Sequence, residues 1–198
     1  MTDYFALLNE PRLPWMDEDL LKKKFLDLSS QAHPDRVHQS SKSMQEEVGA
    51  RYLELNTAYN CLRDPKCRLR HLLELELGKK PADVQNIPPE LVDFAFEIGR
   101  SCKATDALLE EKNKASSAIL RIQFFERGQQ FTAKLQALQR KINERRDVLI
   151  TELKLSNNAW ESDGKTQTLS RIEEIYRLLG YFTRWTEQIQ ERIVELSL

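Results

Sequence analysis

The chain has 198 residues, of which 31% are charged and 40% are hydrophobic, and its formal net charge is −1. This length suits one domain or two small ones, and the balance of charges argues against a nucleic-acid-binding protein, which usually carries a basic excess. The apolar runs are only a few residues long, so no segment is expected to span a bilayer.

A helix is predicted from Asp17 to about Ala32, after a short helical stretch that ends before Pro11. Asp17 has a side chain that caps the free N–H groups of a first helical turn. Pro34 disfavours helical geometry for the residue before it, so the helix ends near Ala32. The apolar residues of this helix recur at steps of four, three and four along one stripe: Leu21, Phe25, Leu28 and Ala32.

Two more helices are predicted in residues 43–78. The first covers 43–63 and lies antiparallel to the preceding helix, with its own apolar stripe: Val48, Tyr52, Leu55, Tyr59 and Leu62. In the next helix Asp64 is a suitable N-cap and Pro65 suits the first helical position, where its missing N–H costs nothing. Gly78 is a natural left-handed residue at the end of that helix. These helices form a compact N-terminal group.

The stretch GKKPADVQNIPP, residues 78–89, is the best candidate for a linker because it holds three prolines and a glycine. A helix is predicted from about Pro89 to near Arg100, a long charged helix from about Thr105 to Leu155, and a turn over 156–165. Gly128 lowers the helical propensity within the long helix.

The last helix has the most regular apolar spacing of the chain, with steps that alternate three and four. Its natural partner is the long helix before it, in an antiparallel pair, although the same residues could join two copies of the chain. The positions of this repeat are Ile172, Ile175, Leu179, Phe182, Thr186, Ile189, Ile193 and Leu196.

The stretch His33-Pro34-Asp35-Arg36 follows the first long helix and allows several interpretations. It could simply end the helix, because Pro and Asp are common in turns. A catalytic His33/Asp35 pair would need a nucleophile or a substrate site, which no motif provides. A metal site could use His33, Asp35 and His38, but no further ligand pair stands at a suitable spacing.

A protein-docking surface is the fourth interpretation of this loop. On a helical wheel Lys23 points directly away from the apolar stripe, and Lys22 and Lys24 flank it, so a basic face leads to the loop. Exposed cations beside a rigid loop that carries an acid favour recognition of an acidic protein surface. A merely solvated helix face would also explain the lysines.

A helix with a basic outer face, then His-Pro-Asp, then an antiparallel amphipathic helix resembles the J domain, and residues 55–75 resemble J domains of the HscB type. That type carries the pattern Asn-x-Ala-Tyr-x-x-Leu-x-x-Pro-x-x-Arg and an N-terminal Asp-Tyr-Phe. The stretch DYFALL near the N-terminus and an Asn-x-x-Trp stretch with Trp160 agree with it. The residues that match the longer pattern are Asn56, Ala58, Tyr59, Leu62, Pro65 and Arg68.

The resemblance implies an all-α fold: a J domain in 1–78 (an antiparallel helical hairpin with flanking helices), a linker in 79–88 and a C-terminal helical bundle in 89–198 with a long antiparallel pair. It implies a co-chaperone that docks on a DnaK-type heat-shock ATPase, stimulates ATP hydrolysis and delivers a client, an iron–sulfur cluster scaffold protein. The docking residues would be His33, Pro34, Asp35, Arg36, Lys22, Lys23 and Lys24.

The same resemblance implies that the chain is not itself an enzyme and uses no cofactor or metal. No nucleic-acid or membrane partner is expected, and a homo-oligomer through the C-terminal helices is possible. The alternative is a helical adaptor whose J-like domain activates no ATPase. This alternative predicts that substitution of Asp35 does not change partner binding.

Three cysteines, an odd number with no C-x-x-C spacing, argue against a disulfide framework. The N-terminal stretch has no basic region before its apolar residues, so a secretory signal is not expected. Both features predict a cytoplasmic protein with reduced thiols.

Overall fold

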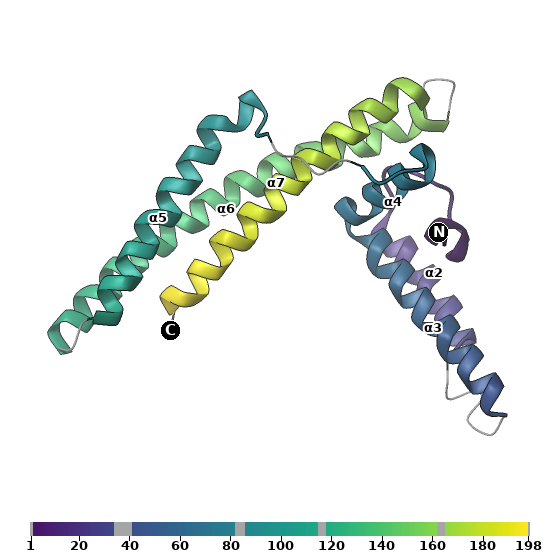
Figure 1. Ribbon diagram of the computed structural model, residues 1–198, viewed down its shortest axis with the longest axis horizontal. Helices are drawn as coiled ribbons and strands as arrows, with labels where there is room; N and C mark the ends of the chain where they lie inside the picture. The colour runs from purple at the N-terminus through teal and green to yellow at the C-terminus, as the bar shows by residue number, and fades with distance from the viewer. Residues whose placement is uncertain (1, 34–40, 82–85, 115–117, 162–164, 198) are drawn as a thin grey trace. The chain divides into compact units, whose positions relative to one another are not determined.

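The computed structural model describes residues 2–33, 41–81, 86–114, 118–161 and 165–197 (Figure 1). These residues form seven α-helices and one short 3-10 helix, and no strand occurs among them. The predicted all-α class is therefore confirmed. Contacts divide the chain into two compact units: a first unit of Met1–Ala82 with Ile150–Tyr176, and a second unit of Asp83–Leu149 with Arg177–Leu198. The domain boundaries drawn from the sequence, at 78 and 89, stay a prediction.

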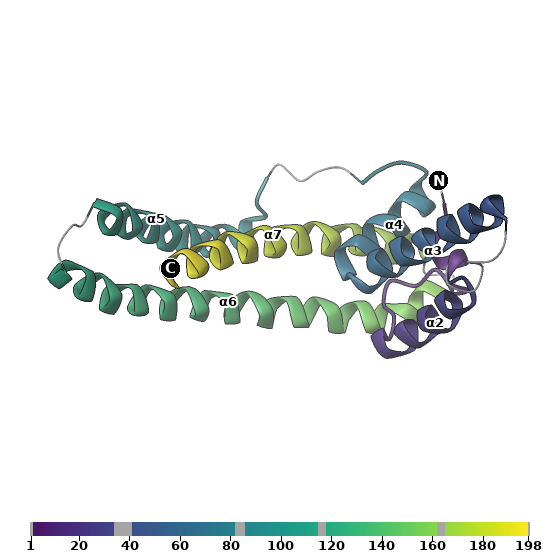
Figure 2. The same cartoon turned by 90° about the horizontal axis from the view of Figure 1, so that it is seen from below.

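The first unit begins with α1 (Tyr4–Leu7), α2 (Glu18–Gln31), α3 (Lys42–Arg63) and α4 (Pro65–Leu77). Helices α2 and α3 lie side by side as an antiparallel hairpin (Figures 1 and 2). The predicted caps are present, since the Asp17 carboxylate accepts from the first turn of α2 and Asp64 accepts from Cys67 N. Gly78 ends α4 with a φ of 66°, which favours glycine.

The hairpin is held together by the two predicted apolar stripes. The Phe25 ring of α2 stacks on the Tyr59 ring of α3, with 4.3 Å between centroids. Burial of such side chains is the main stabilising term of a helical pair, at about 25 cal/mol per Å² of apolar surface. The hairpin residues with at most 1% exposure are Leu21, Leu55, Ala58 and Leu62, and α4 adds Leu69, Leu72 and Leu73.

Arg68 joins three segments in the interior of the first unit. Its side chain is only 2% exposed. Its Nε donates to Pro14 O at 3.0 Å and its Nη1 donates to Leu62 O at 2.6 Å. Burial lowers the pKa of the guanidinium to about 10, although Asp64 and Glu18 oppose the shift. The two backbone acceptors compensate the cost of the buried charge, so Arg68 holds the N-terminal segment against the α3–α4 corner.

Two long helices contribute to both units: α6 (Ala118–Glu161) and α7 (Lys165–Ser197). The predicted turn over 156–165 is wrong for its first half, because α6 continues through Asn157 to Glu161. Packing explains the difference, since Trp160 is only 5% exposed and belongs to the core of the first unit. In the same unit Arg171 of α7 forms an ion pair with Glu152 of α6 at 2.6 Å.

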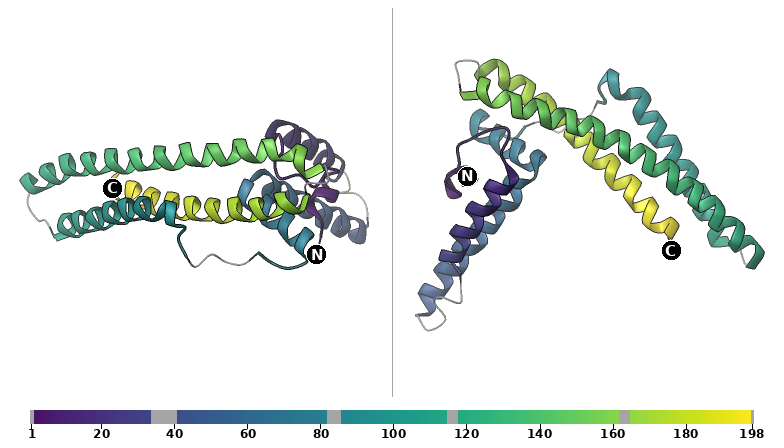
Figure 3. Two further views of the ribbon diagram at one scale, coloured as in Figure 1. Left: turned by 90° about the horizontal axis from the view of Figure 1, so that it is seen from above. Right: turned by 180° about the vertical axis from the view of Figure 1, so that it is seen from behind.

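The second unit consists of η2 (Pro89–Leu91), α5 (Val92–Lys114) and the remaining parts of α6 and α7 (Figures 2 and 3). The predicted helix end near Arg100 is wrong, and so is a new helix from Thr105, because α5 continues through both positions. A single exposed glycine at position 99 costs about 1 kcal/mol in a helix. The burial of Ile98, Cys102 and Thr105 on successive turns outweighs this cost.

An aromatic cluster and a polar pair organise the interior of the second unit. Trp185 of α7 meets the Phe94 ring of α5 edge-on at 5.6 Å between centroids. Thr186, the polar position of the apolar repeat, accepts from Gln139 Nε2 of α6 at 3.0 Å. Gly128 lies inside α6 without breaking it, and its nearest neighbour outside the helix is Leu196 of α7. Of the residues of the apolar repeat, Ile172 and Ile175 in the first unit and Leu179 and Ile189 in the second are at most 2% exposed.

Cys61 and Cys67 form a disulfide across the α3–α4 corner, and Cys102 is a buried free cysteine. The predicted reduced state is therefore wrong for this pair. Spacing along the chain does not indicate the pair, because it is the turn at Asp64-Pro65 that brings the two Cα atoms to 5.1 Å, within the range of disulfides. Among the described residues, no helix has the length and apolar character needed to cross a membrane.

Candidate functional site

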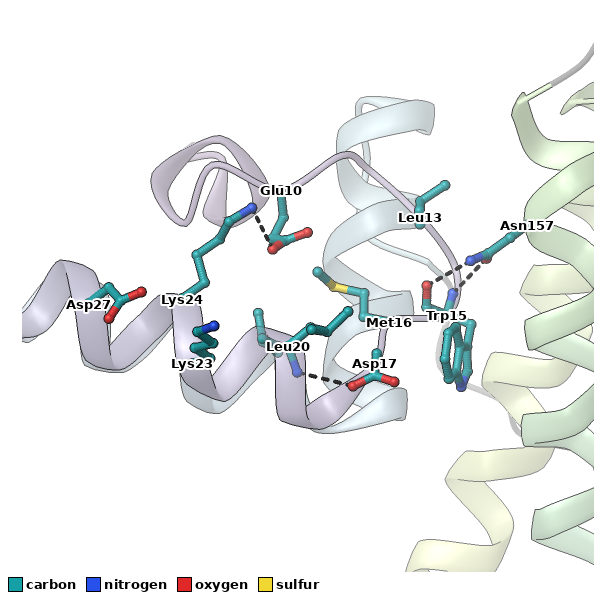
Figure 4. A pocket seen from close by; sticks show the side chains of 11 residues that line it. Glu10, Leu13, Trp15, Met16, Asp17, Leu20, Lys23, Lys24, Asp27 and Asn157 are labelled. Atoms are coloured by element: carbon teal, nitrogen blue, oxygen red, sulfur yellow. Dashed lines mark hydrogen bonds and ion pairs between the residues drawn. The ribbon is translucent and has the colours of Figure 1, made fainter.

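The predicted basic face lies on α2, and its three lysines differ in their contacts. Lys22 and Lys23 are exposed. Lys24 is half-buried, with its Nζ at 2.8 Å from the Glu10 carboxylate and donating to Asn9 O at 2.7 Å (Figure 4). Lys24 therefore already has an acidic partner, and Lys22 and Lys23 are the exposed cations of this face.

His33 lies directly beyond α2, where Ala32 ends the helix as its C-cap. The half-buried imidazole meets the Tyr52 ring of α3 edge-on, with 5.6 Å between centroids and 79° between the ring planes. The first residue of the His-Pro-Asp stretch is thus packed against the opposite helix of the hairpin. Pro34, Asp35, Arg36 and His38 lie outside the described residues.

A cavity of about 520 Å³ opens beside the basic face, between the N-terminal segment and the first turns of α2 (Figure 4). Apolar side chains form its wall, among them Leu13, Met16 and Leu20. Lys23 and Asp27 of α2 also line it. The sequence did not predict this cavity, because one of its lining residues, Asn157, comes from the far end of the chain.

Asn157 holds the segment that leads into α2. Its Oδ1 accepts from Trp15 N at 3.0 Å and its Nδ2 donates to Trp15 O at 2.9 Å, so one side-chain amide satisfies both backbone groups (Figure 4). Trp160 Nε1 donates to Arg12 O at 2.7 Å. Lys154 Nζ lies 4.7 Å from the centroid of the Trp15 indole. These contacts fix the start of α2, and therefore the basic face, within the first unit.

The described residues offer no set of ligands for a metal ion, since no group of three or more His, Cys, Asp or Glu side chains gathers among them. Two residues of the metal-site alternative, Asp35 and His38, lie outside that part of the chain. The arrangement of α2 and α3 therefore presents a charged surface with a packed histidine beside it, which suits binding to another protein.

No family model matches the chain. Among solved structures, it is similar to the chaperone HscB from Vibrio cholerae, with a TM-score of 0.65 and 19% identity over 96% of each chain. It is also similar to the human co-chaperone protein HscB, with a TM-score of 0.64 and 18% identity over 96% of this chain and 81% of that one. The chain therefore has the HscB-type fold, and the predicted resemblance is confirmed for the fold.

Proposed function

We propose that the chain is a J-domain co-chaperone of the HscB type, located in the cytoplasm, that docks on a DnaK-type heat-shock ATPase. One observation carries the proposal: His33-Pro34-Asp35 directly follows the basic helix α2, in a chain that shares the HscB fold over 96% of its length. The two similar proteins are a chaperone and a co-chaperone. The chain is then an activator and no enzyme, because the hydrolysis takes place in its partner.

The docking residues have distinct roles in this proposal. Lys22 and Lys23 attract an acidic surface of the ATPase and raise the association rate, an effect that salt weakens. Asp35 forms the short-range ion pair with a basic group of the ATPase. Lys24 contributes less than its neighbours, because Glu10 already neutralises it.

The neighbours of Asp35 support that ion pair. The HscB resemblance implies that His33 and Pro34 hold this stretch in shape for binding and that Arg36 adds a positive charge beside Asp35. The contact of the His33 ring with Tyr52 supports this role for His33.

The client of the co-chaperone would bind the second unit, within the predicted C-terminal bundle of residues 89–198. An iron–sulfur cluster scaffold protein is the client that the HscB resemblance implies. Leu91 and Phe94 are 3% and 6% exposed and belong to the core of that unit. Client contacts would therefore fall on exposed residues of α5 such as Phe96, which is 67% exposed. Pairing of two copies through the C-terminal helices stays a prediction.

The proposal is tested by the steady-state ATPase rate of the DnaK-type chaperone from the same organism, with and without the full chain. We expect wild-type protein to raise the rate and Asp35→Asn to lower that stimulation by about tenfold or more, since a lost charge partner costs several kcal/mol. Asp93→Asn is a matched control, because it removes the same charge from an exposed position of α5.

Circular dichroism of Asp35→Asn should match that of the wild type. If the wild-type chain stimulates no chaperone of its cell, or if Asp35→Asn stimulates as well as the wild type, the co-chaperone proposal fails. Undiminished partner binding by Asp35→Asn would then favour the helical adaptor.

A further inference from the structure

The α3–α4 corner holds a cystine that the docking function does not use. Cys61 lies in the last turn of α3 and is 6% exposed, whereas Cys67 lies in the first turn of α4 and is half-buried. Their Cα atoms are 5.1 Å apart, so the backbone holds the two residues at a distance that suits a disulfide. Cys67 is thus the more exposed residue of the pair.

Two features stabilise negative charge on Cys67 when the bond is open. Arg70, one turn later in α4, directs its Nη2 to Cys67 Sγ at 3.5 Å. Cys67 also lies at the N-terminal end of a 13-residue helix, where the helix dipole favours anions. Two carboxylates oppose them: Asp64 accepts from Cys67 N at 2.6 Å, and Glu74 pairs with Arg70 at 4.0 Å.

We propose that Cys61 and Cys67 are a thiol–disulfide exchange site, which closes and opens a covalent link at the α3–α4 corner in response to low-molecular-weight thiols. The corner is the place where buried Arg68 joins Leu62 O to Pro14 O, next to Cys67 in the sequence. The disulfide therefore restrains the corner at which Arg68 binds the N-terminal segment that precedes α2.

The exchange proceeds in two balanced steps. A small thiolate attacks the Sγ of Cys67, the more exposed residue, the Cys61–Cys67 bond breaks, and the Cys61 sulfur leaves with the electron pair and takes a proton from solvent. A second small thiolate attacks the small-molecule sulfur of the mixed disulfide and expels Cys67 as a thiolate beside Arg70. Two thiols are oxidised to one small-molecule disulfide, and the protein cystine is reduced to two cysteines.

Cys102 is a suitable internal control for the pair. It is 6% exposed and belongs to the second unit, whereas Cys61 and Cys67 belong to the first. Burial raises the pKa of its thiol, and Asp106 adds to the shift while Arg192 opposes it. A buried thiol of this kind is inert in the folded protein.

The test uses the full chain equilibrated in buffers with different ratios of reduced to oxidised glutathione. Samples are quenched with acid, alkylated with a maleimide and analysed by peptide mass spectrometry. We expect Cys61 and Cys67 to change from disulfide to thiols together in one transition, while Cys102 reacts only after denaturation. If the pair stays reduced in fully oxidising buffer, or if glutathione accumulates on Cys67 without the internal bond, the proposal is wrong.

Arg70→Gln tests the role of the guanidinium. Loss of the cation destabilises the Cys67 thiolate. Half-reduction of the pair should therefore need a ratio [GSH]²/[GSSG], of reduced to oxidised glutathione, about threefold higher than in the wild type. Arg51→Gln is the matched control, because Arg51 is an exposed helical arginine paired with Glu54 and is not involved with a sulfur. If the redox midpoint of Arg70→Gln equals the midpoints of the wild type and of Arg51→Gln, Arg70 does not stabilise the Cys67 thiolate.

The covalent link is tested by thermal unfolding in the same buffers. The oxidised wild type should melt about 5 °C above the reduced wild type, because the bond restricts the unfolded chain. The double variant Cys61→Ala/Cys67→Ala should melt at one temperature in both buffers. Equal melting temperatures for the oxidised and reduced wild type would show that the disulfide does not restrain the corner. These readouts involve no ATPase, so they are independent of the docking proposal.

Discussion

His71 of α4 holds the N-terminal helix through a neutral imidazole. The residue is 4% exposed, and its Nε2 accepts from Tyr4 N at 3.0 Å. Its ring stacks on Tyr4 with 4.4 Å between centroids. Burial lowers the pKa of His71 below its ordinary value of 6.5, although Asp3 opposes the shift. The hydrogen bond needs an unprotonated Nε2, so the contact depends on pH.

The free energy of unfolding should therefore fall in weakly acidic solution. As the pH drops below 6.5, the unfolded chain takes up a proton at His71 before the folded chain does, which favours unfolding. The stabilisation by neutral His71 is complete above that value and is lost as the pH approaches the lowered pKa of the folded state.

Urea unfolding at pH 7.5 and pH 5.5 measures this effect. We expect the wild type to lose more stability between the two pH values than His71→Gln, whose side chain keeps an acceptor and does not titrate. An equal loss in both proteins would contradict the role of His71.

Helix ends in this protein are predictable where they depend on local chemistry. Asp17, Asp64 and Gly78 mark helix boundaries because each satisfies the backbone of its own first or last turn. The extent of α5 and α6 depends instead on distant packing. The polar stretch near Asn157 contains turn-forming residues, yet it stays helical because Asn157 and Trp160 bind backbone groups of another segment.

The two hydrogen bonds of Asn157 connect α6 to the segment before α2, and one substitution removes both. Asn157→Ala should lower the free energy of unfolding by about 2 kcal/mol, at about 1 kcal/mol for each hydrogen bond, because Trp15 N and Trp15 O lose their partner. Asn158→Ala changes an exposed neighbour of the same type in the same helix and is the control. Urea unfolding of the full chain checks both, and equal stability of the two variants would refute the role of Asn157.

For the whole molecule, the sequence predicted the fold class, whereas the docking residues stay a prediction and the contacts that hold α2 in place were not foreseen. The basic face and the His-Pro-Asp stretch lie within one short segment, so motif and periodicity identify them together. Asn157 is separated from Trp15 by 142 positions, and no local pattern indicates that contact. The same limit applies to the Cys61–Cys67 pair, which depends on the geometry of the Asp64-Pro65 corner rather than on a known spacing.

The helix α6 has 44 residues and α7 has 33, and both contribute to the two compact units. Helix formation is cooperative, because adding a residue to an existing helix is easier than starting a new one. Within α6, Leu149 of the second unit and Leu153 of the first are both buried, at 7% and 0% exposure, one turn apart. Loss of one unit therefore removes support from a helix that the other unit needs.

We expect the two units to unfold together. Hydrogen exchange of the full chain, followed by mass spectrometry at increasing urea concentration, should show peptides from 135–149 and 150–160 losing protection at the same concentration. Asn157→Ala should shift both transitions downward by the same amount, although the substitution lies in the first unit. Protection that persists in 135–149 after 150–160 has become exposed would show that the units unfold independently in spite of their shared helices.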